Sequence, residues 1–239
     1  WQPYPIIRFD LYTVPCKALG QLEEGLKRAV HNLAQQHGVV VDTPTPQEGL
    51  KKLIGQVHAK HGQRAVVLVD EYDKPLITNL ERPEVMDDNR EVLREFFGTL
   101  KSADAHLKFT FVTGVSRFSK VSLFTGPNNL DDITMQDPYA TITGYTEAEL
   151  QSAFAEHLQA IAQEQGITPE GVLATIKHWY NGYRFTQAPD CVYNPFSTLK
   201  FLKIGKPQSY WYETATPSFL IQELKKHPDR KSTRLNSSH

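Results

Sequence analysis

The stretch that most constrains the fold of this chain is residues 65–74, Ala-Val-Val-Leu-Val-Asp-Glu-Tyr-Asp-Lys. Five consecutive apolar residues, three of them valine, are typical of a strand buried on both faces in a parallel sheet covered by helices. The strand ends directly in Asp70 and Glu71, and Asp73 follows. Ligands of open parallel sheets bind at the carboxyl ends of the strands, so these carboxylates stand where a functional site is expected.

An apolar strand that ends in Asp-Glu is the pattern called Walker B in nucleotide hydrolases. In those proteins the Asp helps to hold Mg²⁺, and the Glu orients the water that attacks the γ-phosphate. A buried strand that stops in a solvated acidic turn would show the same residues. The motif alone therefore leaves both interpretations open.

The segments around this strand predict alternating strands and helices. Strands are expected at residues 4–11, 65–69 and 107–113. Helices with apolar residues at helical spacing are expected at residues 19–37, 46–61 and 84–103. Thr45-Pro46 supplies a helix start, and Gly38 and Gly62 supply helix ends. This order predicts a parallel sheet with right-handed helical crossovers.

From Gly144 onward the pattern changes to successive helices. A short run at 139–143 predicts a weak final strand before that point. One helix is expected to begin after Thr146 and to end near Gly166. Further helix starts are expected at Thr168-Pro169, Asn194-Pro195 and Thr216-Pro217. We therefore predict an α/β domain over residues 1–143 and a helical domain over residues 144–228.

The composition is that of an ordinary globular protein. Hydrophobic residues make up 40% and charged residues 22%, and the formal charge of −1 gives no global field that favours nucleic acid or anionic membrane. Cys16 and Cys191 lie far apart without CxxC spacing, which argues against a disulfide framework and favours a reducing cytoplasm. No run of about 18 apolar residues occurs, so we expect no transmembrane helix. The histidines lack the spacing of a zinc motif.

The last eleven residues, 229–239, read Asp-Arg-Lys-Ser-Thr-Arg-Leu-Asn-Ser-Ser-His and show no apolar periodicity. They look like one reading frame of a sequencing-adapter oligonucleotide rather than a natural disordered tail, so this segment is excluded from the fold prediction. The chain also opens at Trp1 and enters a strand almost at once. We therefore expect a gene fragment cut at both ends.

Seven blocks of sequence, in the same order, resemble the bacterial AAA-ATPase-like proteins of the P-loop NTPase class. They include Val-Leu-Val-Asp-Glu-Tyr-Asp-Lys-Pro at 67–75, Phe-Val-Thr-Gly-Val-Ser-Arg-Phe-Ser-Lys-Val-Ser at 111–122 and Trp-Tyr-Asn-Gly-Tyr-Arg-Phe at 179–185. The others are at 100–104, 128–134 with 139–146, 193–197 and 210–220. The resemblance runs from about Tyr4 to Lys226. It implies a three-layer P-loop NTPase-type parallel sheet followed by a helical lid or adjoining domain.

The resemblance also implies roles for particular residues. Asp70 would be the Walker B residue that holds Mg²⁺, and Glu71 the water activator. Strand 107–113 would lie beside the phosphate strand, with Thr113 and Ser116 as candidates for the sensor position near the γ-phosphate. Arg117 could reach a phosphate from the same loop. A strand-end hydroxyl that bonds to backbone remains an alternative for Thr113, as does a solvated loop charge for Arg117.

The main departure from the family pattern is the missing Walker A loop, Gly-x-x-x-x-Gly-Lys-Ser/Thr. The sole Gly-Lys pair, Gly205-Lys206, is followed by Pro207 and lacks the earlier glycine. Family members carry this loop upstream of the strand that begins near Tyr4, so the first strand and the P-loop are expected to be missing here. We therefore expect the chain as written to be inactive and not to bind ATP appreciably. The natural protein, by contrast, is expected to bind ATP.

The expected function is that of a fragment of an ATP-binding and ATP-hydrolysing protein with ATP and Mg²⁺ as cofactors. The alternative is a non-catalytic nucleotide switch whose helical half binds a protein partner. Relatives often end in a nuclease-like domain of the PD-(D/E)xK type, which would lie beyond Pro228; whether nucleic acid is a target stays open. The aromatic residues of 179–185 and 210–212 could form a stacking surface for nucleic acid or a partner, but a small second core is favoured.

Overall fold

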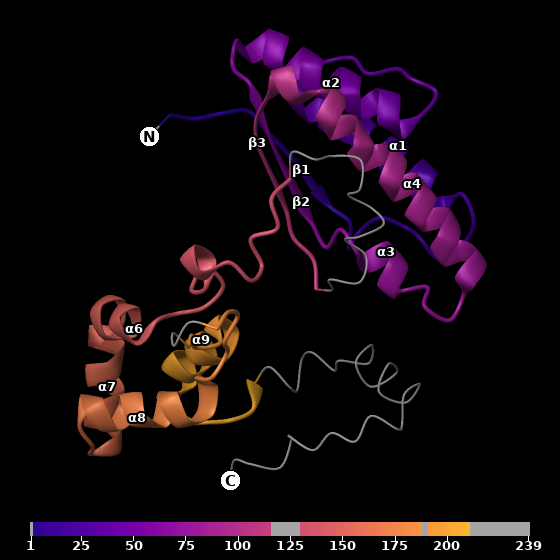
Figure 1. Cartoon of the computed structure of the whole chain (residues 1–239). Coiled ribbons are helices and arrows are strands. Elements are labelled where there is room, and N and C mark those ends of the chain that lie inside the picture. Colours follow the sequence, from indigo (N-terminus) through magenta and orange to yellow (C-terminus); the bar gives the residue numbers. More distant parts are fainter. Residues whose placement is uncertain (1, 116–129, 188–190, 211–239) are drawn as a thin grey trace. The chain divides into compact units, whose positions relative to one another are not determined.

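The computed structural model describes residues 2–115, 130–187 and 191–210. The chain divides into two compact units, Trp1–Asp131 and Asp132–His239 (Figure 1), and each is described by itself. The first unit contains a sheet with helices, and the described part of the second is helical. The predicted boundary near Gly144 lies inside the second unit and stays a prediction.

Three parallel strands form the sheet of the first unit. They are β1 (Ile6–Asp10), β2 (Ala65–Asp70) and β3 (Leu107–Val112), in the spatial order β1-β2-β3. The register aligns Ile6 with Val66 and Asp10 with Asp70. The predicted mixed α/β architecture with a parallel sheet is therefore confirmed.

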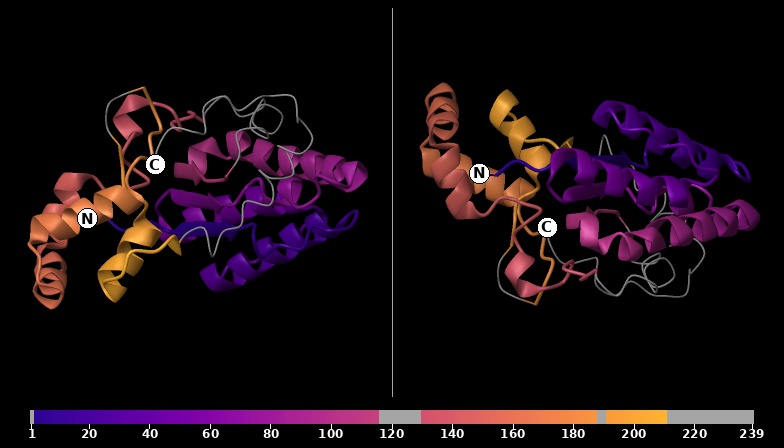
Figure 2. Two further views of the ribbon diagram at one scale, coloured as in Figure 1. Left: turned by 90° about the horizontal axis from the view of Figure 1, so that it is seen from below. Right: turned by 90° about the horizontal axis from the view of Figure 1, so that it is seen from above.

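Helices connect the strands and pack beside one another on one side of the sheet (Figures 1 and 2). They are α1 (Gln21–His37), α2 (Pro46–His61) and α4 (Pro83–Ser102), with the short α3 (Lys74–Ile77) and the 3₁₀ turn η1 (Asp104–His106). Gly38 and Gly62 end α1 and α2 with φ of +60° and +65°, which glycine adopts without a steric penalty. Oγ1 of Thr45 accepts the N–H of Glu48 and so caps α2. The short α3 was not predicted.

The core of the first unit lies between the sheet and these helices. Ile7, Phe9, Val67 and Val69 are buried on that face, and Phe9 packs edge-to-face on Phe96 of α4 at 5.4 Å between ring centroids. The opposite face is covered less: the alternate β2 residues are half-buried. Ile6 and Phe109, which flank that strand, are 52% and 55% exposed.

The prediction that β2 is buried on both faces is therefore wrong for the described residues. Sequential strands that lie side by side place all their connecting helices on one face when the crossovers share one hand. A continuous apolar run does not distinguish a strand covered on two faces from one covered fully on a single face.

Two buried asparagines hold the loop after β1 against α3 and α4. The side-chain Nδ2 of Asn79 donates to the backbone oxygens of Cys16 and Pro75, both at 2.8 Å. Nδ2 of Asn89 donates to the same two oxygens at 3.0 and 3.1 Å. Both asparagines are 0% exposed, so their bonds replace solvent for carbonyl groups that would otherwise be buried unpaired. The loop after β1 and the helix after β2 are thereby tied together.

The second unit contains the 3₁₀ turn η2 (Asp137–Tyr139) and the helices α6 (Glu147–Ala153), α7 (Ala155–Gln165), α8 (Pro169–Tyr180) and α9 (Pro195–Ile204). The predicted strand at 139–143 is wrong, because those residues form the end of η2 and turns. The predicted helix from Thr146 to Gly166 is divided at Phe154, whose ring packs edge-to-face on Tyr145 at 5.4 Å. The predicted starts at Thr168-Pro169 and Asn194-Pro195 are confirmed. The start at Thr216-Pro217 lies outside the described residues.

The aromatic residues of the second unit divide into a buried and an exposed group. Tyr180 is 3% exposed and packs with Phe201 and Tyr210, as a second core requires. Trp179 and Tyr183 are 44% and 38% exposed, so the second-core prediction is wrong for these two. Trp179 lies on α8 next to Tyr180, and adjacent residues of a helix face different directions.

Candidate functional site

The carboxyl ends of the three strands meet at one edge of the sheet, where polar side chains gather. Asp10 ends β1 and Asp70 ends β2, and the two are register partners. Thr113 directly follows β3, and its N–H donates to the carbonyl oxygen of Val69 at 2.8 Å. The edge therefore holds two carboxylates and a hydroxyl that come from three different strands.

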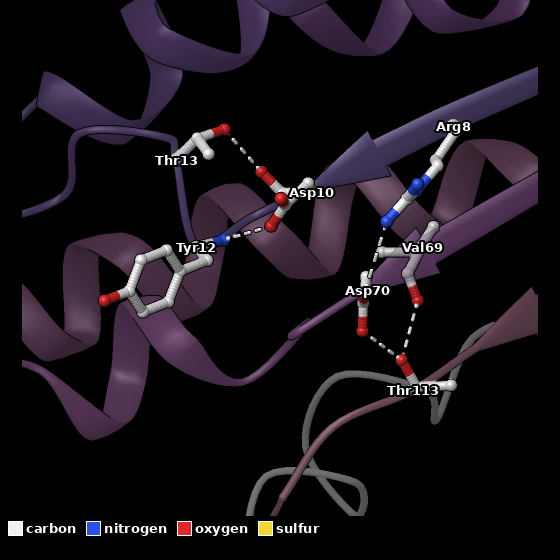
Figure 3. A network of polar contacts seen from close by, with 7 residues as sticks. All are labelled: Arg8, Asp10, Tyr12, Thr13, Val69, Asp70 and Thr113. Atoms are coloured by element: carbon white, nitrogen blue, oxygen red, sulfur yellow. Dashed lines mark hydrogen bonds and ion pairs between the residues drawn. The ribbon is translucent and has the colours of Figure 1, made fainter. Parts of the chain in front are cut away.

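Asp70 is contacted from both neighbouring strands (Figure 3). Oγ1 of Thr113 donates to its Oδ1 at 2.6 Å, and Nη2 of Arg8 lies 3.6 Å from its Oδ2. The Arg8 and Asp70 side chains are 63% and 50% exposed, and an ion pair this exposed stabilises the fold by at most about 1 kcal/mol. Asp70 thus presents a half-exposed carboxylate that a solvent cation can reach.

Asp10 turns the chain at the end of β1. Its Oδ1 accepts the N–H of Tyr12 at 3.0 Å, and its backbone oxygen accepts Oγ1 of Thr13 at 2.9 Å (Figure 3). The ring of Tyr12 in turn lies under Lys74, whose Nζ is 4.7 Å from the ring centroid. This cation–π contact links the loop after β1 to the first residue of α3.

Glu71 has an unusual backbone conformation. Its φ of +54° makes it the one non-glycine residue in the left-handed region among the described residues. That conformation costs a residue with a Cβ atom about 1–2 kcal/mol, because Cβ approaches the following carbonyl oxygen. Strained residues of this kind concentrate at functional sites. The strain therefore supports a functional role for the turn after β2.

The environment of Glu71 raises the pKa of its carboxyl above the ordinary value of 4.5. Burial of the half-buried side chain is the largest cause, followed by the negative charge of Asp73; the nearby Lys74 acts in the opposite direction. Asp70 and Asp10 add smaller contributions that also raise the pKa. A carboxylate with a raised pKa is a stronger base, which suits a group that accepts a proton from water.

The raised pKa predicts a pH-dependent gain in stability from Glu71→Gln. Because the folded-state pKa lies above the unfolded one, the ionised carboxylate destabilises the fold above the folded-state pKa, and this cost vanishes below about pH 4.5. We therefore expect the variant to have a higher Tm than the original chain at pH 7–8, and the same Tm at pH 4. Thermal unfolding at the two pH values measures this. The exposed Glu81→Gln is the control, and an equal gain at both pH values would contradict the prediction.

The donors at this edge are oxygen atoms from Asp10, Asp70 and Thr113. Mg²⁺ prefers such hard ligands, and it commonly takes one or two protein carboxylates with phosphate and water as its other ligands. The residues present therefore fit a magnesium–phosphate group. Among the described residues, no group of three or more His, Cys, Asp or Glu side chains is arranged to hold a metal ion.

The structure brings together three of the residues singled out from the sequence. Thr113 bonds to Asp70, and Glu71 follows Asp70 directly. The hydroxyl of Thr113 also lies 3.5 Å from the carbonyl oxygen of Val69, so the alternative of a bond to backbone is present as a longer contact. Ser116 and Arg117 lie outside the described residues. Asp10 was missed, although its place at the end of the predicted first strand was a usable signal.

No helix in the described part of the chain is long and apolar enough to cross a membrane. No solved structure matches the chain. A curated protein from Azotobacter chroococcum mcd 1, called "Uncharacterized protein in vnfD 5'region", is 44% identical over 221 residues. The match covers 92% of this chain and 40% of that protein, so the chain spans about two-fifths of the length of this relative.

The model of the AAA-ATPase-like family, described as "Predicted AAA-ATPase", matches residues 1–124. This region is slightly more than half of the 239 residues and contains β1, β2, β3 and the carboxyl edge described above. The chain therefore belongs to the AAA-ATPase-like family.

Proposed function

We propose that this chain carries the Walker B and sensor half of a site that binds and hydrolyses ATP. The observation that carries the proposal is the 2.6 Å bond from Thr113 to Asp70 at the carboxyl edge of the sheet, with Glu71 in the next position. A carboxylate for the metal, a candidate base and a polar strand-end residue thus come from two neighbouring strands. Membership of the AAA-ATPase-like family supports the same site.

Each residue has a distinct task in this proposal. A bound Mg²⁺ supplies positive charge that stabilises the phosphate oxygens during transfer. Asp70 would hold that ion through its half-exposed carboxylate. Glu71 orients a water and accepts its proton, for which the raised pKa is suited. Thr113 fixes one oxygen of Asp70 with its hydroxyl, and it would have to release this bond to donate its proton to the γ-phosphate.

The shape of the sheet supports the P-loop NTPase-type arrangement. β3 is an edge strand in the described residues, and its Phe109 is 55% exposed. A phosphate strand beside β3 and a helix on the uncovered face would complete a three-layer sheet. They would also bring a Walker A loop to the edge that holds Asp70 and Thr113. Ser116 and Arg117, which follow Thr113 in the sequence, stay candidates outside the described residues.

The proposal is tested on the protein expressed from its complete reading frame. We expect saturable, Mg²⁺-dependent ATP binding by equilibrium titration and phosphate release in a single-turnover assay. Asp70→Ala is expected to weaken Mg²⁺-ATP binding by more than about tenfold, a cost seen even when outer partners of a metal site are disturbed. Asp132→Ala, which removes an exposed carboxylate of the second unit, is the control. Wild-type protein that neither binds nor hydrolyses ATP would exclude the proposed function.

A nucleotide-dependent switch without turnover is the second candidate. The exposed Trp179 of α8 favours it, because a large aromatic side chain that is 44% exposed is suited to a partner surface. This candidate predicts tight ATP binding with negligible phosphate release, so the same single-turnover assay distinguishes the two. In either case, the ATP site could regulate a nuclease-like domain fused downstream of it in the same protein.

A further inference from the structure

Asp73 uses its side chain in an unusual way. It occupies the position before α3, where an aspartate commonly caps its own helix, yet its side chain makes no bond to the N–H groups of that helix. Its Oδ1 instead accepts the N–H of Val115, in the segment after β3, at 3.2 Å. Asp73 is 0% exposed, and a buried carboxylate is costly unless hydrogen bonds compensate it. The side chain therefore joins two segments that lie far apart in sequence.

Two further contacts join the same segments. The N–H of Tyr72 donates to the carbonyl oxygen of Thr113 at 3.0 Å. Gly114 lies so close to Tyr72 that a Cβ atom at residue 114 would stand 2.4 Å from Cε1 of the ring and 2.6 Å from Oδ1 of Asp73. A side chain at residue 114 would thus displace either the ring or the carboxylate. We call the contacts of Tyr72 and Asp73 with residues 113–115 the latch.

We propose that Asp73 is a positioning residue: through the latch it holds Thr113 and Glu71 in one fixed arrangement. Thr113 is bonded on both sides, through its carbonyl oxygen to Tyr72 and through its hydroxyl to Asp70. Glu71 lies in the chain between these two partners, in its left-handed conformation. The position of the candidate base therefore depends on the segment after β3, which Asp73 secures at Val115.

The latch is a set of contacts in the structure, whereas its effect on ATP turnover rests on the proposed ATPase function. A displacement of about 1 Å in a group that positions a reactant can cost about 10²-fold in rate. Loss of the latch is therefore expected to lower kcat more than it changes the KM for ATP. A role in stability alone would not produce this separation in a protein that remains folded at the assay temperature.

The first experiment compares Asp73→Ala with Asp73→Asn by hydrogen exchange, resolved at the Val115 amide. Asp73→Ala is expected to accelerate exchange at Val115 at least tenfold, while the Thr113 amide, bonded to Val69, keeps its protection. Asp73→Asn retains an oxygen acceptor and is expected to restore most of the protection. Asp132→Ala is the matched control, because Asp132 likewise accepts a backbone N–H, that of Thr134, at 3.0 Å.

The second experiment measures ATP turnover of the same variants in the protein expressed from its complete reading frame. Asp73→Ala is expected to lower kcat about 10²-fold with KM within about threefold of wild type, and Asp73→Asn to recover most of the rate. Gly114→Ala disturbs the latch from the other side while Asp73 itself is not replaced, and it is expected to give the same pattern. Gly55→Ala in α2 is its control, because a Cβ atom there meets nothing within 4 Å.

The outcomes separate the latch from the proposed function. Unchanged exchange at Val115 in Asp73→Ala would overturn the latch, whatever the protein does with ATP. Accelerated exchange with wild-type kcat would overturn the positioning role and leave the ATPase proposal intact. Accelerated exchange in a protein whose wild type shows no ATP turnover would retain the latch and exclude the proposed function instead.

Discussion

Replacing Glu71 by glutamine is expected to lower the single-turnover rate of ATP hydrolysis by about 10²–10⁴-fold, the usual contribution of a general base. Glutamine keeps the size of the side chain and can adopt the same backbone conformation, but it cannot accept a proton from water. ATP affinity should stay close to that of wild type, because the proposed magnesium residue, Asp70, is unchanged. In this variant the rate of ATP hydrolysis is therefore expected to fall while the affinity for ATP is unchanged.

The measurement is phosphate release under single-turnover conditions, with equilibrium ATP binding determined on the same preparation. Glu81→Gln is the control, since Glu81 is exposed and lies in the turn after α3. The expected rise in Tm of Glu71→Gln at neutral pH excludes unfolding as a cause of lost turnover. Full turnover in Glu71→Gln would show that Glu71 does not activate the water. The left-handed conformation of Glu71 would then serve the fold alone.

The strands and the long helices of the first unit were predictable because local signals and tertiary packing agree there. The apolar run that ends in Asp70 predicts β2, and the structure places it over Ala65–Asp70. Glycines at residues 38 and 62 end the helices where left-handed backbone is needed. The contact between Asp70 and Thr113 follows from the parallel order of β2 and β3, which brings the two strand ends to one edge.

The remaining features depend on contacts that a linear sequence does not display. The run at 139–143 has strand-forming residues but no neighbouring strand in the described part of the chain, so its β propensity is not realised. The break at Phe154 falls where its ring packs on Tyr145. In the sequence Asp73 is one of three acidic residues that follow the strand, and its bond to Val115 becomes visible only once β3 lies beside β2. Positions such as these, where local rules fail, are often functional.

Phe96→Ala is expected to destabilise the first unit by about 3–5 kcal/mol, the usual cost of removing a phenylalanine from a core. Phe96 is 0% exposed, and its ring packs edge-to-face on Phe9 at 5.4 Å and on Phe97 at 5.7 Å. Its removal leaves a cavity between α4 and β1, next to the strand that ends in Asp10. At this size the effect corresponds to a decrease in Tm on the order of 10 °C, measured by thermal unfolding of the 239-residue chain.

Phe109→Ala is the matched control, and it also tests whether a helical layer covers the second face of the sheet. Phe109 is 55% exposed on the uncovered face, so in the 239-residue chain its removal should cost less than about 1 kcal/mol. In the protein expressed from its complete reading frame, a helix on that face would bury the ring, and the cost should then approach that of Phe96→Ala. An equally small cost in both proteins would count against the three-layer arrangement, because a buried phenylalanine cannot be removed without leaving a cavity.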